Sequence, residues 1–509
     1  MLTPKLPDAL VRGLSKIKGD DSGRLGGLAR FLTLALVTLA TALVARRFGY
    51  TMEQTASLAT FVMLVAATAL YWEFHLAFAF LGVSAILLLN ILDLADLASE
   101  TKLDVIIFLM GMMIIVGVLK DLGLFSWIIT RILSMESMSA GKFTFVACIS
   151  GAIMSCLVDE MASVVFAAAL IFQVADALDV RPLPFIMMAV ISINIGSAGT
   201  MLGNPVTILI GQNAHPPLAF NDFMIWSFPL MAAEFIVVMV VLFRVFRAQI
   251  REMNDKMAER RAAGLSLAPM VRVPHNRGLM VLGGLLVILI LHKAIEKALG
   301  LQPNTMLITA PLLISGLLLV YRREHIHKYL AHDVDWGIIM FLMMLFMIAG
   351  ALERTGATTR IAHTFAAAFG DSPAVLIPAV LGVSALGSAF VENIVFVAAF
   401  MPVVTTLEQT PLLWALLHGC CLGGNITMIG STSNIVAVGM MEKRYWTKIH
   451  FMEWLKTGIL VGVISCLVAW AGIALLAPHM PTHAERVESY ENAIQGRATR
   501  VEARDMEKK

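Results

Sequence analysis

Apolar segments recur along almost the whole chain, separated by short polar stretches. Many of them reach the roughly 17 to 25 residues that an α-helix needs to cross the hydrocarbon core of a bilayer. Of the 509 residues, 58% are hydrophobic and 15% are charged, which is too apolar for a soluble protein of several domains. We therefore predict an all-α polytopic membrane protein.

We expect about 11 transmembrane helices and two re-entrant hairpins. The spans are predicted at 30–46, 56–72, 76–95, 104–120, 183–213, 223–246, 278–296, 303–321, 335–352, 411–441 and 453–477, and the hairpins near 139–178 and 373–409. Basic residues cluster between Arg244 and Arg277. The positive-inside rule places this cluster in the cytoplasm, with the N-terminus, and leaves the C-terminus outside.

The predicted spans divide the chain into five parts. These are a cytoplasmic N-terminal segment (1–28), a first membrane repeat (29–246), a cytoplasmic linker (247–277), a second membrane repeat (278–477) and a polar C-terminal tail (478–509). The first part lacks a short apolar core followed by a cleavage site, so we expect no removable signal peptide. The expected location is a bacterial inner (plasma) membrane.

The two membrane repeats share a pattern of residues. An offset of 233 residues places Asp159 on Glu392 and Gly117 on Gly350, and an offset of 227 places Gly203 on Gly430. In the predicted topology the two copies run in opposite directions across the membrane. Inverted repeats with interrupted helices near the midplane are a recurrent transporter architecture.

Each predicted hairpin carries acidic and amide side chains within apolar sequence, Asp159-Glu160 in the first and Glu392-Asn393 in the second. A carboxylate at membrane depth costs about 2.5 kcal/mol or more, so it needs an ion, a proton or a substrate as partner. The alternative for Asp159 and Glu392 is a hydrogen bond that locks a re-entrant tip. Glu160 aligns with Asn393, not with an acid, and we expect it to serve one half only.

Two Gly-rich runs interrupt predicted spans, Gly203-Asn204-Pro205-Val206-Thr207 and Gly430-Ser431-Thr432-Ser433-Asn434. Proline supplies no amide proton, so backbone carbonyls at such a break can face a cation. Oxygen ligands suit hard cations, and we place a possible Na⁺ at Asp159, Asn204, Glu392 and Asn434. The whole predicted ion-binding set is Asp159, Glu160, Asn204, Pro205, Thr207, Glu392, Asn393, Ser431, Thr432, Ser433 and Asn434, with helix-break glycines Gly199, Gly203, Gly424 and Gly430. Glycines here, including Gly196 and Gly423, can instead be close-packing positions between helices.

Other polar residues in apolar sequence have plainer interpretations. Glu234 is either a relay group or a partnered structural acid, and His418 is expected to be a hydrogen-bonded interior residue. Charged residues at span ends, among them Asp96 and Arg354, are expected to meet headgroups or water. The five cysteines read as small packing residues. We expect no cofactor, with Na⁺ or H⁺ as the coupling ion, and no nucleic-acid partner.

The run from Phe108 to Gly123, the two hairpins and the paired breaks resemble the ion transporter superfamily. The likeness covers about residues 30–475. Within the superfamily it is to the arsenite permease, P protein and sodium/proton antiporter branch, which is related to divalent anion:sodium symporters. It implies a homodimer in which a mobile transport domain moves against a static scaffold in an elevator mechanism. P-like members have Gly-Asp-Pro-Pro-Asn at the first break, whereas this chain has one acid fewer there.

The predicted function is secondary active ion transport by alternating access, with Na⁺/H⁺-type cation–proton exchange as the leading hypothesis. As many as three acids near the site would repel a dianion unless Na⁺ neutralised them. The alternative is Na⁺- or H⁺-coupled transport of an anion or metalloid, such as a dicarboxylate or arsenite. An enzyme is not expected, because the chain has neither a His-Glu-x-x-His motif nor a phosphate-binding Gly-x-x-x-x-Gly-Lys-Ser/Thr loop.

Overall fold

The computed structural model describes residues 29–71, 74–134, 138–263, 276–302, 304–445 and 449–492, and the regular structure in these ranges is entirely helical. This confirms the predicted all-α class. The predicted N-terminal segment 1–28 lies outside these ranges, as do 264–275 of the linker and 493–509 of the tail.

Seven helices in the described ranges are long and apolar enough to cross a membrane, and two bent helix pairs bring this to as many as nine. The count of 11 spans stays a prediction. One reason for the difference is that the spans predicted at 183–213 and 411–441 are each divided into two short helices.

The chain forms two compact units. The smaller unit comprises the described residues of Met1–Glu100 and Met344–Thr358, and the larger unit those of Thr101–Met343 and Thr359–Lys509. The smaller unit contains the helix Ala29–Arg47, α2 (Met52–Leu70), α3 (His75–Leu88), α4 (Leu94–Glu100) and the end of α18 (Trp336–Arg354). Within it, α2 packs against α3.

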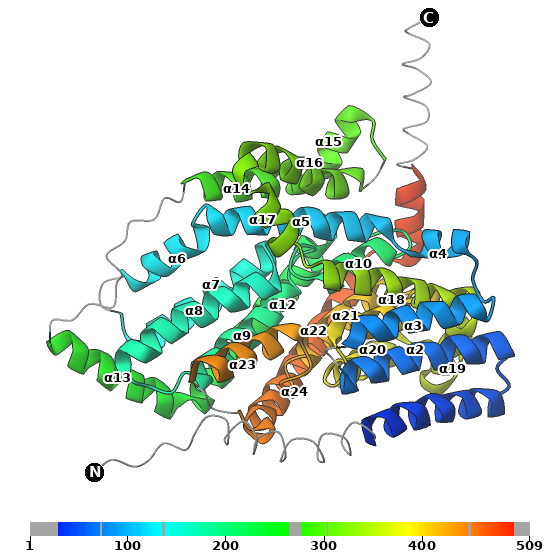
Figure 1. Cartoon of the computed structure of the whole chain (residues 1–509), viewed down its shortest axis with the longest axis horizontal. Coiled ribbons are helices and arrows are strands. Elements are labelled where there is room, and N and C mark those ends of the chain that lie inside the picture. Colours follow the sequence, from blue (N-terminus) through cyan, green and yellow to red (C-terminus); the bar gives the residue numbers. More distant parts are fainter. Residues whose placement is uncertain are drawn as a thin grey trace, which may run out of the picture. The chain divides into compact units, whose positions relative to one another are not determined.

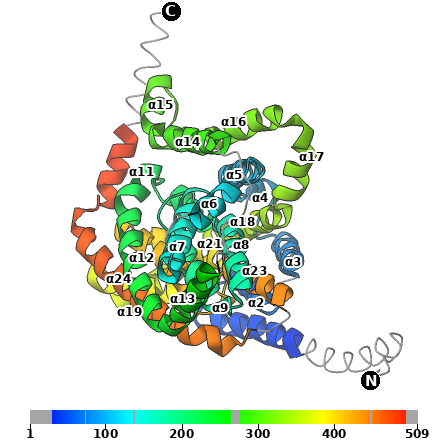
Figure 2. The ribbon, with the colours of Figure 1, turned by 90° about the vertical axis from the view of Figure 1, so that its left-hand side faces the viewer.

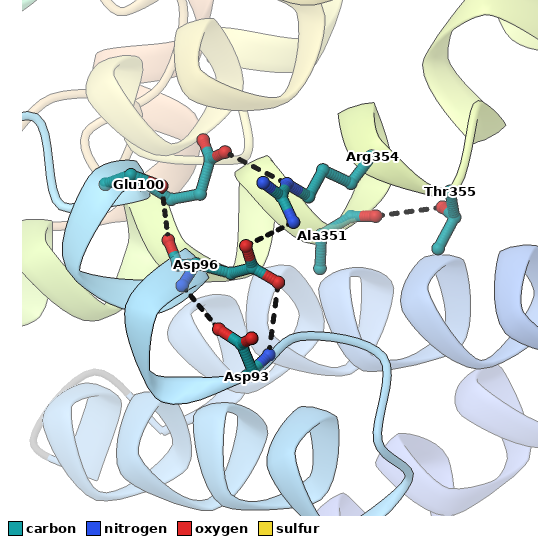
Figure 3. Close-up of polar contacts among 7 residues, drawn as sticks. Asp93, Asp96, Glu100, Ala351, Arg354 and Thr355 are labelled. Atoms are coloured by element: carbon teal, nitrogen blue, oxygen red, sulfur yellow. Dashed lines mark hydrogen bonds and ion pairs between the residues drawn. The ribbon is translucent and has the colours of Figure 1, made fainter.

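Charged residues of the smaller unit pair with one another (Figure 3). Arg354 forms an ion pair with Asp96 and lies 3.8 Å from a carboxylate oxygen of Glu100. Asp93 and Asp96 each accept a hydrogen bond from the other's backbone amide, which fixes the start of α4. The expectation that Asp96 and Arg354 simply meet headgroups or water is therefore wrong, because each has a protein partner of opposite charge.

The larger unit holds the predicted hairpins and helix breaks. Its helices are α5 (Leu103–Asp121), α6 (Leu124–Leu133), α7 (Ala140–Leu157), α8 (Glu160–Leu178), α9 (Leu183–Ser197), α10 (Pro205–Asn213), α11 (Phe220–Asp222), η2 (Phe223–Ser227), α12 (Phe228–Val245), α13 (Arg247–Ala262), α14 (Asn276–Ile290), α15 (His292–Leu299), α16 (Thr305–Tyr321), η3 (Arg323–His325), α17 (Ile326–Lys328), η4 (Tyr329–Asp333), α20 (Pro373–Ser388), α21 (Asn393–Thr406), α22 (Thr410–Gly423), α23 (Thr432–Tyr445), α24 (Phe451–Leu476), η5 (Ala477–His479) and a last helix over 483–492, while α18 and α19 (Ala357–Phe369) cross the unit boundary along the chain.

Two quartets of helices within this unit correspond to each other. α7 and α8 form the first predicted hairpin and α20 and α21 the second, and the pairs α9/α10 and α22/α23 contain the predicted breaks. α7 packs closely on α9, and α20 packs in the same way on α22. Figure 1 labels these four helices. Proline occupies a first-turn position of α10, α20 and α22, where its missing amide leaves no bond unmade.

Glycine permits both of these close helix crossings. A Cβ on Gly196 of α9 would collide with the backbone of Ala152 in α7, and one on Gly423 of α22 would collide with the backbone of Ala385 in α20. These two contacts are related by the same offsets, 227 and 233, that align the sequence motifs. At Gly196 and Gly423 the packing interpretation is therefore the one that the structure supports.

We expect Gly196→Ala or Gly423→Ala to lower the free energy of unfolding by about 1 to 3 kcal/mol, because the added methyl group overpacks a helix crossing. Thermal unfolding in detergent measures the effect as a lower Tm. Gly439→Ala is the matched control, because nothing lies within 4 Å of a Cβ built there in α23. Equal melting temperatures for the Gly196 and Gly439 variants would contradict the close-crossing interpretation.

Candidate functional site

The first helix break, residues 198–204, folds back on the end of α9. A Cβ on Gly203 would overlap the carbonyl oxygen of Ser197, so only glycine fits there. Asn204 then caps α10, since its Oδ1 accepts a hydrogen bond of 2.9 Å from the Thr207 amide. The predicted residues Asn204, Pro205 and Thr207 thus form the start of α10, and the Asn204 amide nitrogen points inward, where it donates to the Ser197 hydroxyl at 2.7 Å.

A threonine ties each break to the tip of its own hairpin. Thr200 donates to the carbonyl of Cys156, and Thr427 donates to the carbonyl of Ala389 at 2.5 Å. The two threonines are 227 residues apart and the two acceptors 233, so both halves use the same bond. Sequence reasoning missed Thr200 and Thr427, although their match under the repeat offset was available as a signal.

Glu160, at the first turn of α8, occupies the centre of a buried polar cluster. Its side chain is 7% exposed. One carboxylate oxygen lies 2.8 Å from the Ser431 hydroxyl and 2.5 Å from the Ser433 hydroxyl, and the other lies 3.4 Å from the Asn204 amide nitrogen. The expectation that Glu160 serves one half only is wrong, because Ser431 and Ser433 come from the second half.

Three asparagines extend this cluster. Asn434 donates to the carbonyls of Gly424 and Thr427 at 2.7 and 2.8 Å, which turns its Oδ1 toward Asn194. Asn194 uses its amide nitrogen for Asn434 and Asn425, at 3.0 and 2.8 Å, and so presents its own Oδ1 to Ser433 at 2.6 Å. Asn194 was not among the predicted residues, although a lone amide in a buried apolar helix was a usable signal.

The hydrogens of this cluster do not suffice for its short contacts. Ser433 donates to Asn194, so it has no second hydrogen for Glu160. Ser431 has one hydrogen for two neighbours, Ser433 at 2.6 Å and Glu160 at 2.8 Å. A proton on Glu160 would supply the hydrogen for its 2.5 Å contact with Ser433, and a cation among these oxygens would bind them without any hydrogen. Oxygens that share a hard cation at about 2.3 to 2.6 Å are expected to lie roughly 3 Å or more apart, so the present spacing suits the proton.

The other predicted carboxylates have different surroundings. Asp159 is half-buried and caps α8, its Oδ2 accepting from the Ala162 amide at 3.1 Å. This favours the interpretation of Asp159 as a lock on the hairpin tip. Glu392 is also half-buried and accepts from the Thr432 hydroxyl at 3.1 Å.

The contacts described for these side chains do not join Asp159, Asn204, Glu392 and Asn434 into one Na⁺ ligand set. Asn393, the counterpart of Glu160, accepts from Ser388 at 2.5 Å. The helix-break glycines Gly199, Gly424 and Gly430 lie at close contacts, with Asn393 against Gly424 and the Gly424 carbonyl against Gly430.

A second buried pair lies behind the first break. Glu234 of α12 and His418 of α22 are fully buried, with 2.7 Å between a carboxylate oxygen and Nδ1. Nε2 of His418 lies 2.9 Å from the Ser227 hydroxyl, which also contacts the Ala198 carbonyl at 2.6 Å. Glu234 therefore has His418 as a close ionisable neighbour, although the 2.7 Å approach lacks hydrogen-bond geometry. His418 is an interior histidine that is hydrogen-bonded through Nε2 to Ser227.

Comparison with known proteins identifies related transporters. Residues 60–419 match the family described as "Citrate transporter". The "Uncharacterized transporter Rv2684" of Mycobacterium tuberculosis is 31% identical over 405 residues, covering 77% of this chain and 91% of that protein. The P protein of Mus musculus is 24% identical over 446 residues, covering 72% of this chain and 53% of that protein.

A solved structure shares the fold. The Alcanivorax borkumensis YdaH transporter, described as having an unusual topology, aligns with a TM-score of 0.51 at 15% identity. The alignment covers 84% of this chain and 98% of that chain. The predicted likeness to the ion transporter superfamily and its P protein branch is thus confirmed.

Proposed function

The chain belongs to the citrate transporter family and is a secondary transporter, not an enzyme. We propose that it exchanges a cation for protons at Glu160. The observation that carries this proposal is the Glu160 cluster, a buried acid among hydroxyl and amide oxygens that lacks hydrogens for its short contacts. No lysine or arginine contacts Glu160 among the described residues.

One carboxylate that binds either a proton or a cation is sufficient for exchange. In the proposed cycle, protonated Glu160 holds the cluster closed at hydrogen-bond spacing. Loss of the proton leaves an anionic carboxylate beside the oxygens of Ser431, Ser433 and Asn194. These oxygens can then move apart and bind a hard cation such as Na⁺. Since the two ligands compete for the same oxygens, binding of one on one side of the membrane releases the other.

A second candidate is coupled transport of an anion of the citrate class. The helices α8, α10, α21 and α23 begin at the hairpin tips and breaks, at Glu160, Pro205, Asn393 and Thr432. Helix N-termini carry partial positive charge and bind carboxylates. The family description favours this candidate, and Na⁺ or H⁺ at Glu160 would then neutralise the site for the anion.

Three further proposals rest on the family likeness. They are a homodimer, elevator movement of part of each protomer, and location in a bacterial inner membrane, the last supported by the mycobacterial relatives.

Proteoliposomes with an internal pH dye test the proposed function. An imposed gradient of Na⁺, Li⁺ or K⁺ should drive proton movement in the opposite direction without any organic anion present. Proton flux that appears only when citrate, a dicarboxylate or arsenite is added would reject the exchanger and favour the second candidate. Empty liposomes and Glu160→Gln protein provide the background.

A further inference from the structure

The larger unit contains a cavity of about 760 Å³ that the Glu160 cluster does not share. Pockets of roughly 300 to 1,000 Å³ are typical of sites for small ligands. Its wall is formed by α15, the segment 216–222, the first turns of α22 and the C-terminal helix over 483–492. Trp226, Leu301 and Tyr490 give it a partly apolar lining.

The acids of this cavity already have partners, whereas its lysines do not. Glu296, Asp222 and Glu485 each accept a backbone amide hydrogen bond, at 2.8, 2.7 and 2.7 Å. Lys293 and Lys297 lie one turn apart on α15, are exposed, and have no ion pair or hydrogen bond among the described residues. With Arg486, which also lines the cavity, the lysines balance the charge of the three acids. It is therefore the two unpaired ammonium groups, and not a net positive charge, that favour a ligand with an anionic oxygen.

Two buried donors at the inner wall also lack partners. Trp414 is fully buried and Thr410 is 4% exposed, and both line the cavity. Neither the Trp414 indole nitrogen nor the Thr410 hydroxyl has a hydrogen-bond partner in the described part of the chain. A buried donor without an acceptor costs about 1 to 3 kcal/mol, so an oxygen-rich ligand would relieve both groups.

The α15 helix has the character of a segment at the membrane surface. It bends by 65° from the apolar α14. Leu291, before α15, and Leu299, at its end, are 49% and 61% exposed, while the two lysines follow its polar side. Helices of this kind lie at the level of the lipid headgroups. Figure 2 shows α15 next to α14 and α16, and both neighbours contact it.

We propose that this cavity binds a glycerophosphate group, with the phosphate on Lys293 and Lys297; the chains of a lipid that carries this group would lie along the exposed leucines. Lysine binds phosphate as a point charge and needs no forked geometry. The same chemistry has two sources, the headgroup of an anionic phospholipid or a soluble glycerophosphate. The proposal does not depend on which solute is transported.

Native mass spectrometry of delipidated full-length protein tests the site. The protein is titrated with short-chain phosphatidylglycerol, with phosphatidylcholine of the same chains, or with glycerol 3-phosphate. In the Lys293→Gln/Lys297→Gln variant we expect phosphatidylglycerol binding to weaken by about tenfold or more, the effect of losing one to two charged contacts. Lys443→Gln/Lys456→Gln removes the same charge from exposed lysines outside the cavity and should bind as the wild type does.

The outcomes separate the sources. Strong binding of phosphatidylglycerol with weak competition by glycerol 3-phosphate identifies a lipid site, and equal binding of the two identifies a soluble ligand. The proposal is overturned if phosphatidylcholine binds as well as phosphatidylglycerol, if no ligand binds, or if both lysine variants bind alike. Thr410→Val, which replaces the unpartnered hydroxyl of the cavity wall by a methyl group of similar size, should weaken binding in addition.

Discussion

Replacing Glu160 by Gln is expected to abolish coupled transport while the protein still folds. Glutamine has the size of glutamate and can still accept from Ser431, but its amide neither binds a proton nor attracts a cation. Loss of a charged contact of about 3 kcal/mol corresponds to a decrease of roughly a hundredfold in the affinity for the cation. Cation-driven proton flux in proteoliposomes measures the effect, and size-exclusion chromatography verifies the fold.

Two control variants test whether the loss of transport is specific to the charge of Glu160 or follows from the removal of any carboxylate. Asp159→Asn should retain most transport, since asparagine caps a helix as well as aspartate does. Glu252→Gln, at an exposed position of α13, should behave as the wild type. Normal, pH-dependent exchange by the Glu160→Gln protein would show that another group carries the ion, and Glu392 would be the next candidate.

The helix breaks and hairpins could be predicted from sequence because their causes are local. Gly203 and Pro205 mark the first break, and acidic residues at 159 and 392 mark the hairpin tips, as the structure has them. A residue that must be glycine, or that begins a helix as proline, acts through its own backbone. The repeat offset then predicts the corresponding break or hairpin tip in the other half.

The identity of the central acid could not be predicted in this way. The repeat pairs Asp159 with Glu392, and this correspondence favours the two residues at the hairpin tips as the central acids. Glu160 meets Ser431 and Ser433 across 271 and 273 residues of chain, a contact that exists only after the two halves have packed together. The same holds for the contact of Asn194 with Asn434.

The two repeats also share an equivalent glycine–acid contact that the sequence patterns did not indicate. A Cβ on Gly117 would meet the carboxylate of Asp333, and one on Gly350 would meet that of Glu100. Both the two glycines and the two acids are 233 residues apart. Each glycine thus lies against an acid that belongs to the other sequence repeat, which a comparison of the repeats by sequence alone does not reveal.

Removing one member of the buried Glu234–His418 pair is expected to destabilise the protein strongly, whereas removing both is not. Glu234→Leu or His418→Leu leaves a polar or charged group without its partner in a fully buried position. Breaking a buried pair in this way costs about 3 to 5 kcal/mol, while replacing both partners by apolar residues of similar volume is often neutral. Unfolding in detergent by denaturant, followed by circular dichroism, measures the three variants.

The double variant decides whether the pair contributes to stability through mutual charge or through separate packing. Ser227 keeps an acceptor in every variant, because it contacts the Ala198 carbonyl as well as His418. We therefore expect the Glu234→Leu/His418→Leu protein to unfold near the wild-type midpoint, far above either single variant. Additive losses would mean that the two side chains act independently. In that case the 2.7 Å approach of Glu234 to His418 is not an energetic pair, and the link from Glu234 to the first helix break has no support.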